Sequence, residues 1–240
     1  MHSNFFIMEK KKSVEQLFNI PIFTPENRGK LETFYEKNNK TIVYFLSFVA
    51  IAFIGYFGYK NFIIKPKEKE ARSLIFIAER YFQADSFQKA LNGQPPSVYG
   101  FLDIIDEYGN TPSGNLAKYY AGLCYLHLGK YEDAVDYLKK YKTNSEIMKP
   151  LSLGALGDAH AQLKEYDDAV KYYLKAAKSK KNTFTTPFFL LKAGITYGAM
   201  DEDEKALKAF EKIKKDYPKS QQANNIDKYI GRAKAKIENR

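Results

Sequence analysis

The segment GDAHAQLKEYDDAVKYY, Gly157–Tyr173, has a counterpart on each side of it in the chain. The counterparts are GLCYLHLGKYEDAVDYL, Gly122–Leu138, and GITYGAMDEDEKALKAF, Gly194–Phe210. The leading glycines are 35 and 37 residues apart, and in each copy an alanine follows twelve residues after the glycine. Small residues at two fixed places, repeating with a period of about 34 residues, predict a stack of helical hairpins whose two helices cross closely.

Six small residues mark the predicted helix crossings. They are Gly122 with Ala134, Gly157 with Ala169, and Gly194 with Ala206. Sixteen residues after each glycine comes a large apolar residue, which we expect to fill the space beside it. The chain reads as helix from Ala71 onward, and we therefore predict an all-α solenoid of about four hairpins with a C-terminal capping helix.

The repeat domain is predicted to span 71–240. Its first hairpin is divergent because the segment Asn92–Pro96, rich in turn residues, interrupts the pattern. The predicted units are a divergent repeat at 71–114, repeats near 115–148, 150–183 and 187–220, and a capping helix at 221–236.

Before the repeats lies an apolar run without a charged residue, Thr41–Tyr59. A helix of this length spans about 28 Å, close to the hydrocarbon thickness of a bilayer. Its Ile, Val, Leu and Phe side chains favour insertion by roughly 3 to 6 kcal/mol in total. We therefore predict a single transmembrane helix at 41–64 that acts as an uncleaved signal anchor. The flanking segments are predicted to be a mostly flexible tail at 1–40 and a charged hinge at 65–70, broken by Pro66.

Charge does not orient this segment, because basic residues are nearly balanced on its two sides. The net charge of +10 permits nucleic acid or anionic lipid as a partner, but the basic residues alternate with acids along predicted helices. We interpret them as solvated helix faces and expect no nucleic-acid partner. The densest basic runs are 10–12, 60–72 and 178–181, and lipid phosphate could attract the first two, which flank the apolar segment.

We expect no enzyme activity, cofactor, metal or small-molecule substrate. The single cysteine, Cys124, lies on an apolar helix and reads as a core residue. His160 stands where the other copies have tyrosine, so we expect it to pack rather than to bind a metal. The chain contains neither a glycine-rich phosphate loop nor a nucleophile motif.

The repeats resemble the tetratricopeptide repeat, whose pattern of small and aromatic residues is matched by the third copy from Gly194 to Pro218. The first two copies lack the closing proline. In that family the first helix of each hairpin lines a concave groove. The resemblance implies that ten side chains here contact a partner protein: Ile75, Phe82, Leu116, Tyr119, Leu123, Leu126, Leu151, Phe188, Leu191 and Ile195. They are mostly apolar or aromatic, which suits extended apolar segments or an amphipathic helix.

The whole layout is similar to the YfgM-like membrane-anchored repeat proteins of bacteria, particularly their Bacteroidetes forms. The similarity rests on the anchor and on the stretches KPKEKEA, GFLDIIDEYGNT and GNLAKYYAGLCYL. It implies an inner-membrane protein with a cytoplasmic N-terminus and periplasmic repeats. It also implies a place beside the Sec translocon and the chaperone PpiD, and unfolded secreted chains as clients.

Three alternatives stay open at this stage. The repeats could assemble a fixed envelope complex without binding clients, or they could lie in the cytoplasm. The groove could also be filled by the chain's own C-terminal helix, in which case partners would bind elsewhere.

Overall fold

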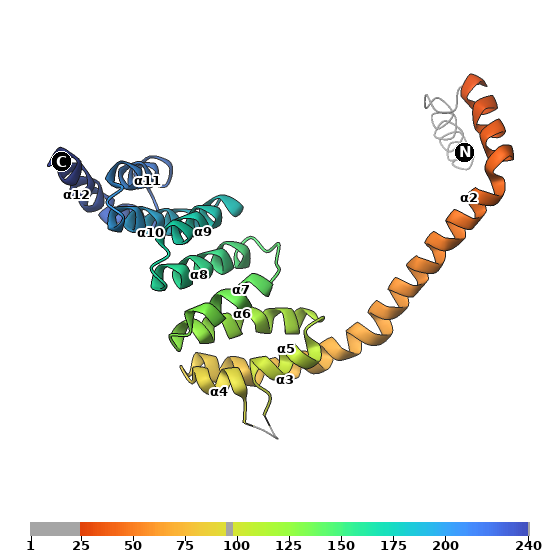
Figure 1. The fold of residues 1–240 in the computed structure, drawn as a ribbon, viewed down its shortest axis with the longest axis horizontal. Coiled ribbons are helices and arrows are strands. Elements are labelled where there is room, and N and C mark those ends of the chain that lie inside the picture. The colour runs from red at the N-terminus through yellow and green to blue at the C-terminus, as the bar shows by residue number, and fades with distance from the viewer. Residues whose placement is uncertain (1–24, 95–97, 240) are drawn as a thin grey trace, which may run out of the picture. The chain divides into compact units, whose positions relative to one another are not determined.

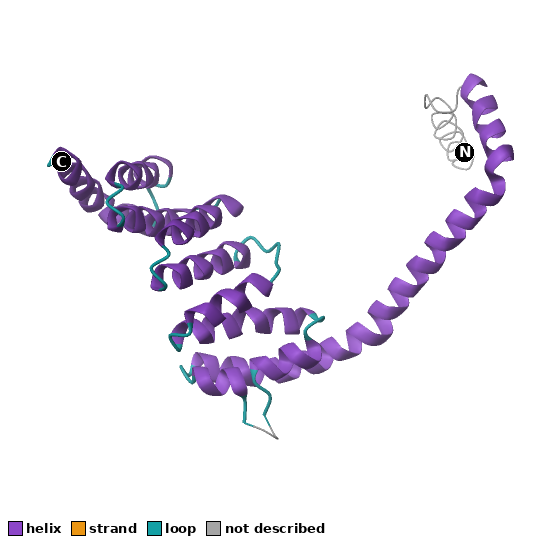
Figure 2. Ribbon diagram, in the orientation of Figure 1, coloured by secondary structure: helices purple, strands orange, loops and turns teal. Residues whose placement is uncertain are grey.

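The computed structural model describes residues 25–94 and 98–239. These residues form helices joined by short loops, and the structure assigns them no strand beyond an isolated bridge between Gln94 and Val98 (Figure 2). The predicted all-α class is therefore confirmed. The chain divides into two units, residues 1–62 and 63–240.

The N-terminal unit contains the apolar helix. Helix α2 runs from Pro25 to Tyr59. The helical stretch that continues to Gln83 contains a segment of mean hydropathy 2.0, and none of that segment is buried. A helix this long and this apolar can cross a membrane. The prediction of a flexible tail up to residue 40 was wrong for Pro25–Lys40, which are helical. Residues 1–24 lie outside the described part of the chain.

The predicted hinge at 65–70 is also helical. A π-helical turn, η2, covers Lys60–Ile64, and α3 follows directly at Lys65–Gln83. Pro66 lies in the first turn of α3, where a missing N–H and a fixed φ are tolerated. The proline therefore marks the start of a helix rather than an irregular segment.

The second unit is a row of helix pairs, and Figure 1 shows the pairs following one another from α3 to α12. The first helices of the four pairs, called A helices below, are α3, α6 (Pro112–His127), α8 (Met148–Gln162) and α10 (Thr185–Ala199). Their partners, called B helices, are α4 (Phe87–Asn92) with α5 (Phe101–Tyr108), then α7 (Tyr131–Lys140), α9 (Tyr166–Ser179) and α11 (Asp203–Asp216). A short 3-10 helix, η3 (Gln221–Asn225), and α12 (Ile226–Glu238) close the row.

The turn inside each pair repeats one backbone conformation. Asp85, Gly129, Lys164 and Asp201 take φ of 53°, 74°, 62° and 56°. They occupy equivalent places in the four hairpins, seven residues after Ala78, Gly122, Gly157 and Gly194. A left-handed residue favours glycine, yet only one copy has it. The conformation therefore belongs to the hairpin, and its presence at Asp85 shows that the divergent first pair turns in the same way.

The helices of each pair cross at the leading glycine. A Cβ added to Gly122, Gly157 or Gly194 would lie 2.6, 2.5 or 2.3 Å from the side chain sixteen residues later, which is Leu138, Tyr173 or Phe210. No carbon side chain tolerates so short a contact. The alanines opposite, Ala134, Ala169 and Ala206, are fully buried. The small residues thus allow the large residue of the B helix to lie directly on the A-helix backbone.

Candidate protein-binding surface

The predicted groove side chains lie on the A helices, but their exposure differs widely. We call the outward side of α3, α6, α8 and α10 the A-helix face. Of the ten predicted residues, Ile75 and Tyr119 are buried, Phe188 and Ile195 are exposed, and Phe82, Leu116, Leu123, Leu126, Leu151 and Leu191 are half-buried. The two most accessible side chains belong to the last A helix, α10.

Ile75 and Tyr119 do not offer a surface to a partner. Ile75 is 5% exposed, because α3 packs against α4, α5 and α6. Tyr119 is 8% exposed, and its ring lies 5.3 Å from that of Tyr141 in the following loop. Burial raises the pKa of Tyr119 to about 12. Both side chains therefore pack in the core beneath the A-helix face.

Phe82 is engaged inside the first two pairs. Its ring packs edge-on against Phe87 and Tyr120, with centroids 5.5 and 5.2 Å away. Phe87 stacks in turn on His127 at 4.2 Å. Aromatic contacts of this kind stabilise by about 0.5–1.5 kcal/mol each beyond area burial. The Phe82 side chain therefore packs largely against aromatic rings of the chain itself.

The C-terminal half of the A-helix face is more exposed, and its lysine and aspartate side chains form an ion pair. Lys192 of α10 places its Nζ 2.6 and 2.8 Å from the carboxylate oxygens of Asp158 on α8. The hydroxyl of Tyr173 donates to the same carboxylate at 2.6 Å, and burial together with Asp158 raises the pKa of Tyr173 well above its ordinary value. Lys192 also lies over the Phe188 ring at 5.2 Å. Because Lys192 and Asp158 neutralise each other, the exposed Phe188 ring lies beside a charge pair that carries no net charge.

The C-terminal helix does not fill this surface. A pocket of about 360 Å³ remains between α10, α11 and α12, and Ile195 and Gly198 line it from α10. Tyr229 and Arg232 line it from α12. Ile195 keeps 46% of its surface exposed. A side chain of a partner can therefore enter beside Ile195.

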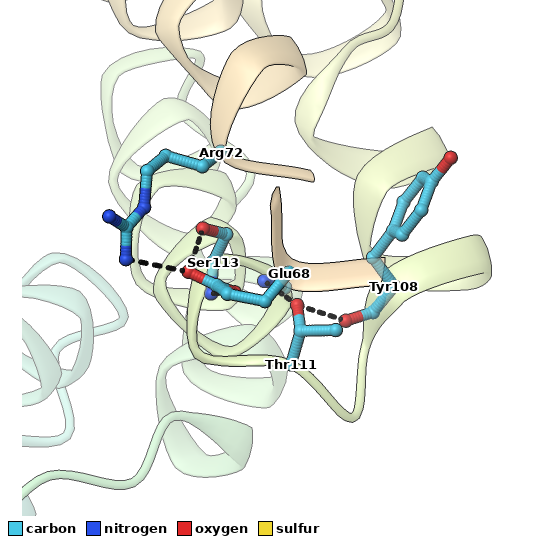
Figure 3. A network of polar contacts seen from close by, with 6 residues as sticks. Glu68, Arg72, Tyr108, Thr111 and Ser113 are labelled. Carbon is cyan, nitrogen blue, oxygen red and sulfur yellow. Dashed lines mark hydrogen bonds and ion pairs between the residues drawn. The ribbon is translucent and has the colours of Figure 1, made fainter. Parts of the chain in front are cut away.

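A contact between adjacent A helices was not visible in the sequence. A Cβ added to Gly154 of α8 would lie 1.9 Å from the ring of Phe189 on α10. The repeat pattern aligns Gly154 with the groove position of Tyr119, but here the next repeat covers it. A second missed contact joins Glu68 of α3 to Ser113 at the start of α6 (Figure 3). Neither contact could be predicted from the spacing of its two residues in the sequence.

One polar cluster has the residue types of a metal site. His160, Glu165 and Asp168 bring candidate ligand atoms within 4.8 Å of one another, which the sequence analysis did not expect. Nδ1 of His160 lies 2.6 Å from the Glu165 carboxylate, while its Nε2 is buried without a partner. The Glu165 carboxylate only accepts hydrogen bonds, so the proton of the neutral ring lies on Nδ1, which leaves that atom without a lone pair for a metal. The tautomer that fits instead has Nδ1–H donating to Glu165, with the ring stacked on Tyr172 at 5.1 Å.

Comparison with known proteins identifies the repeats. Residues 101–146, 152–183 and 189–220 match family models described as tetratricopeptide repeat. A crystal structure of nearly identical TPR-like repeats from Podosopora anserina superposes with a TM-score of 0.56 at 16% identity, covering 72% of this chain and 89% of that one. The crystal structure of MamA gives a TM-score of 0.50 at 19% identity, with coverage of 70% and 92%. At these identities the likeness concerns the fold alone.

A curated relative shares part of the sequence. A TPR repeat-containing protein of Methanocaldococcus jannaschii is 32% identical over 108 residues, which is 45% of this chain. The match spans 18% of that protein's length. The repeats of this chain are thus tetratricopeptide repeats, an architecture whose extended surfaces serve protein–protein interaction.

Proposed function

We propose that this tetratricopeptide-repeat chain is a membrane-anchored scaffold that binds apolar segments of partner proteins on its A-helix face. The observation that carries the proposal is the exposure of Phe188 and Ile195, at 39% and 46%, beside an open pocket and a self-neutralised charge pair. An apolar surface on a rigid array of helices favours an amphipathic helix or an extended apolar segment.

The anchor would hold this binding surface close to the membrane. The apolar segment within α2 is long enough to cross a bilayer, and Lys65 begins the first helix of the repeat domain only a few residues after the segment ends. Tethering raises the effective concentration of the surface near the membrane, so that weak contacts become occupied. A scaffold that meets its partners at a membrane needs no high intrinsic affinity.

In its narrower form the proposal places the anchor in a bacterial inner membrane, with the N-terminus in the cytoplasm and the repeats in the periplasm. The clients are unfolded secreted chains leaving the Sec translocon, and the second partner is a chaperone of the PpiD kind. This form rests on the resemblance of layout and sequence to the YfgM-like proteins. A reporter enzyme that is active only outside the cytoplasm, fused after Arg240, tests the topology: activity supports it and inactivity rejects it.

Binding is tested with the full chain in a nanodisc of phosphatidylcholine. The probe is a dye-labelled, net-neutral peptide of leucine, phenylalanine, serine and glycine. Phe188→Asp combined with Ile195→Asp is expected to weaken binding about tenfold or more, because two charges would face the apolar ligand. Phe76→Asp is the matched control, since Phe76 is 60% exposed on α3 and is not among the groove residues. Equal affinities for all three chains would reject the proposal.

A second candidate function is a structural subunit of an envelope complex that binds no client. The burial of Ile75 and Tyr119 favours it, because these two predicted groove residues are covered by the chain itself. The two functions separate in cells that carry the Phe188→Asp, Ile195→Asp chain. If client crosslinks disappear while the complex stays intact, the first function is supported. If the complex dissociates while client crosslinks are unchanged, the second is supported.

A further inference from the structure

A second surface of the repeat domain carries a feature that the A-helix face does not explain. Between α9 and α11 lies a groove whose rim consists of five exposed lysines, Lys178, Lys181, Lys205, Lys208 and Lys212. We call it the lysine groove. Its main pocket has a volume of about 360 Å³. A shallower neighbour of about 560 Å³ shares Leu174, Lys178, Tyr197 and Lys205 with it, so the two are continuous.

Helix periodicity builds the rim. Lys171, Lys175 and Lys178 follow one another on one side of α9 at spacings of four and three residues. Lys205, Lys208 and Lys212 do the same on α11 at spacings of three and four. Like charges three or four residues apart destabilise a helix by a few tenths of a kcal/mol each. Two such stripes beside α10, against which both helices pack, concentrate positive charge along the groove.

The floor of the groove is apolar. Leu174 of α9, together with Leu190 and Tyr197 of α10, lines it between the lysines. Leu190 and Tyr197 are seven residues apart, as are Phe188 and Ile195, and the two pairs are about 200° apart around the helix axis. The lysine groove therefore lies on the side of α10 opposite to the A-helix face. The two surfaces can be occupied at the same time.

The carboxylates at the groove do not neutralise it. Glu202 accepts a hydrogen bond from Lys205 at 2.7 Å, and Lys212 pairs with Asp216. The third carboxylate on the lining is Asp167. Among the residues that the structure describes, no ion pair joins Lys178, Lys181 or Lys208 to a carboxylate. These three lysines thus stay without an ion pair in the described part of the chain, although Lys181 adds to the effect of Lys212 in lowering the pKa of Asp216.

We infer that the lysine groove binds a short acidic segment of a partner protein in which one or two apolar side chains are flanked by Asp or Glu. The apolar side chains fill the floor along Leu174, Leu190 and Tyr197, and the carboxylates meet the lysines. The stripe from Lys171 to Lys178 on α9 is about 10 Å long, which matches about seven residues of a helical ligand, and Lys181 follows just beyond the end of α9. Phosphates of nucleic acid or lipid would use the charges but not the floor, so both together favour a peptide.

The experiment uses the full chain in a nanodisc of uncharged-headgroup phosphatidylcholine. The probe is a dye-labelled acidic peptide, Asp-Glu-Asp-Phe-Glu-Asp-Leu-Glu-Asp-Glu, and fluorescence anisotropy measures its affinity. Changing Lys178, Lys181 and Lys208 to Gln is expected to weaken binding about tenfold or more. The matched control changes Lys219, Lys228 and Lys234 to Gln, since these exposed lysines lie outside the groove, and affinity is expected to stay within twofold.

Two further probes decide the chemistry of the ligand. A peptide with Ser in place of Phe and Leu is expected to bind about tenfold more weakly, because it keeps the carboxylates but has no apolar side chain to fill the floor of the groove. Equal binding of the two peptides, or equal loss in both triple variants, would overturn the inference. So would a single-stranded oligonucleotide, or vesicles of phosphatidylglycerol, that bound through Lys178, Lys181 and Lys208 while the acidic peptide did not. The Phe188→Asp, Ile195→Asp chain is expected to bind the acidic peptide normally, which separates this surface from the A-helix face.

Discussion

Glu68 and Ser113 are 45 residues apart in sequence and share two hydrogen bonds. The Glu68 carboxylate accepts from the backbone N–H of Ser113 at 2.8 Å and from its hydroxyl at 2.9 Å (Figure 3). Ser113 lies in the first turn of α6, where backbone N–H groups lack partners within the helix. The Glu68 side chain is 15% exposed. The helix that begins the repeat domain therefore caps the next A helix.

Removing this cap is expected to loosen the first two pairs. Glu68→Gln and Ser113→Ala are each predicted to lower the free energy of unfolding by about 1–2 kcal/mol, with a coupling of about 1 kcal/mol between them. Urea unfolding of the full chain in detergent micelles measures both. Arg72→Gln is the control, because Arg72 is 78% exposed and its ion pair with Glu68 contributes less than about 1 kcal/mol. Strictly additive losses would contradict the contact.

Gly194→Ala is predicted to destabilise the last pair. Its new Cβ would lie 2.3 Å from the Phe210 ring, and forced repacking of this kind costs about 1–3 kcal/mol. Gly198→Ala on the same helix is the control, since nothing lies within 4 Å of its added Cβ. There the better helix propensity of alanine should leave stability unchanged or raise it by up to about 1 kcal/mol. Urea unfolding that ranked the two variants in the opposite order would refute the crossing geometry.

Cys124 is predicted to resist alkylation until the chain unfolds. It is fully buried, and burial raises the pKa of its thiol from 9.0 to about 12. The thiolate is therefore scarce in the folded chain at pH 8, and iodoacetamide should react only in concentrated guanidinium chloride. Because the folded pKa is raised, the stability that Cys124 contributes is fully present below about pH 9 and is lost as the pH rises to about 12.

A suitable reference for that measurement is a Cys124→Ala chain that carries Lys234→Cys, which places a thiol at an exposed position. This chain should be labelled at once in the native state. Equal labelling rates for the two chains would show that α6 is not packed as described.

Ile51→Arg is predicted to impair membrane insertion. Ile51 lies near the centre of the apolar run, where exchanging isoleucine for arginine costs about 3 kcal/mol. The variant should shift from the carbonate-resistant membrane pellet toward the soluble fraction. Phe76→Arg, made at an exposed site in the repeat domain, should stay in the pellet. If Ile51→Arg pelleted as completely as the unchanged chain, the run would not be the anchor.

The sequence predicted the repeat pairs because their geometry depends on local spacing. Gly157 and Tyr173 are sixteen residues apart, and one hairpin brings them together whatever lies around it. The divergent first pair was also recognisable, since Ala78 takes the glycine place. The structure adds that Asp85 adopts the common turn. The helical start at Pro25 was missed, because breakers such as Pro25 and Gly29 can also lie within the first turns of a helix.

The surface was harder to predict than the fold. A family position says which side of a helix a residue occupies, but not whether the neighbouring repeat covers it. Gly154 is covered by Phe189 through a contact between repeats that no single repeat encodes, and the Tyr119 ring lies against Tyr141 at the end of its own repeat. The lysine groove was likewise read as ordinary solvated helix, because α9 and α11 contribute their stripes from positions about 35 residues apart.

Site-specific photocrosslinking in cells tests the central claim most directly. A benzophenone side chain replaces Phe188 or Ile195 in one pair of chains and Phe76 in a control chain. The account predicts crosslinks to partner proteins from Phe188 and Ile195, which excess net-neutral apolar peptide suppresses in isolated membranes, and much weaker crosslinks from Phe76. Crosslinks that were equally strong from Phe76, or that the apolar peptide left unchanged, would contradict it.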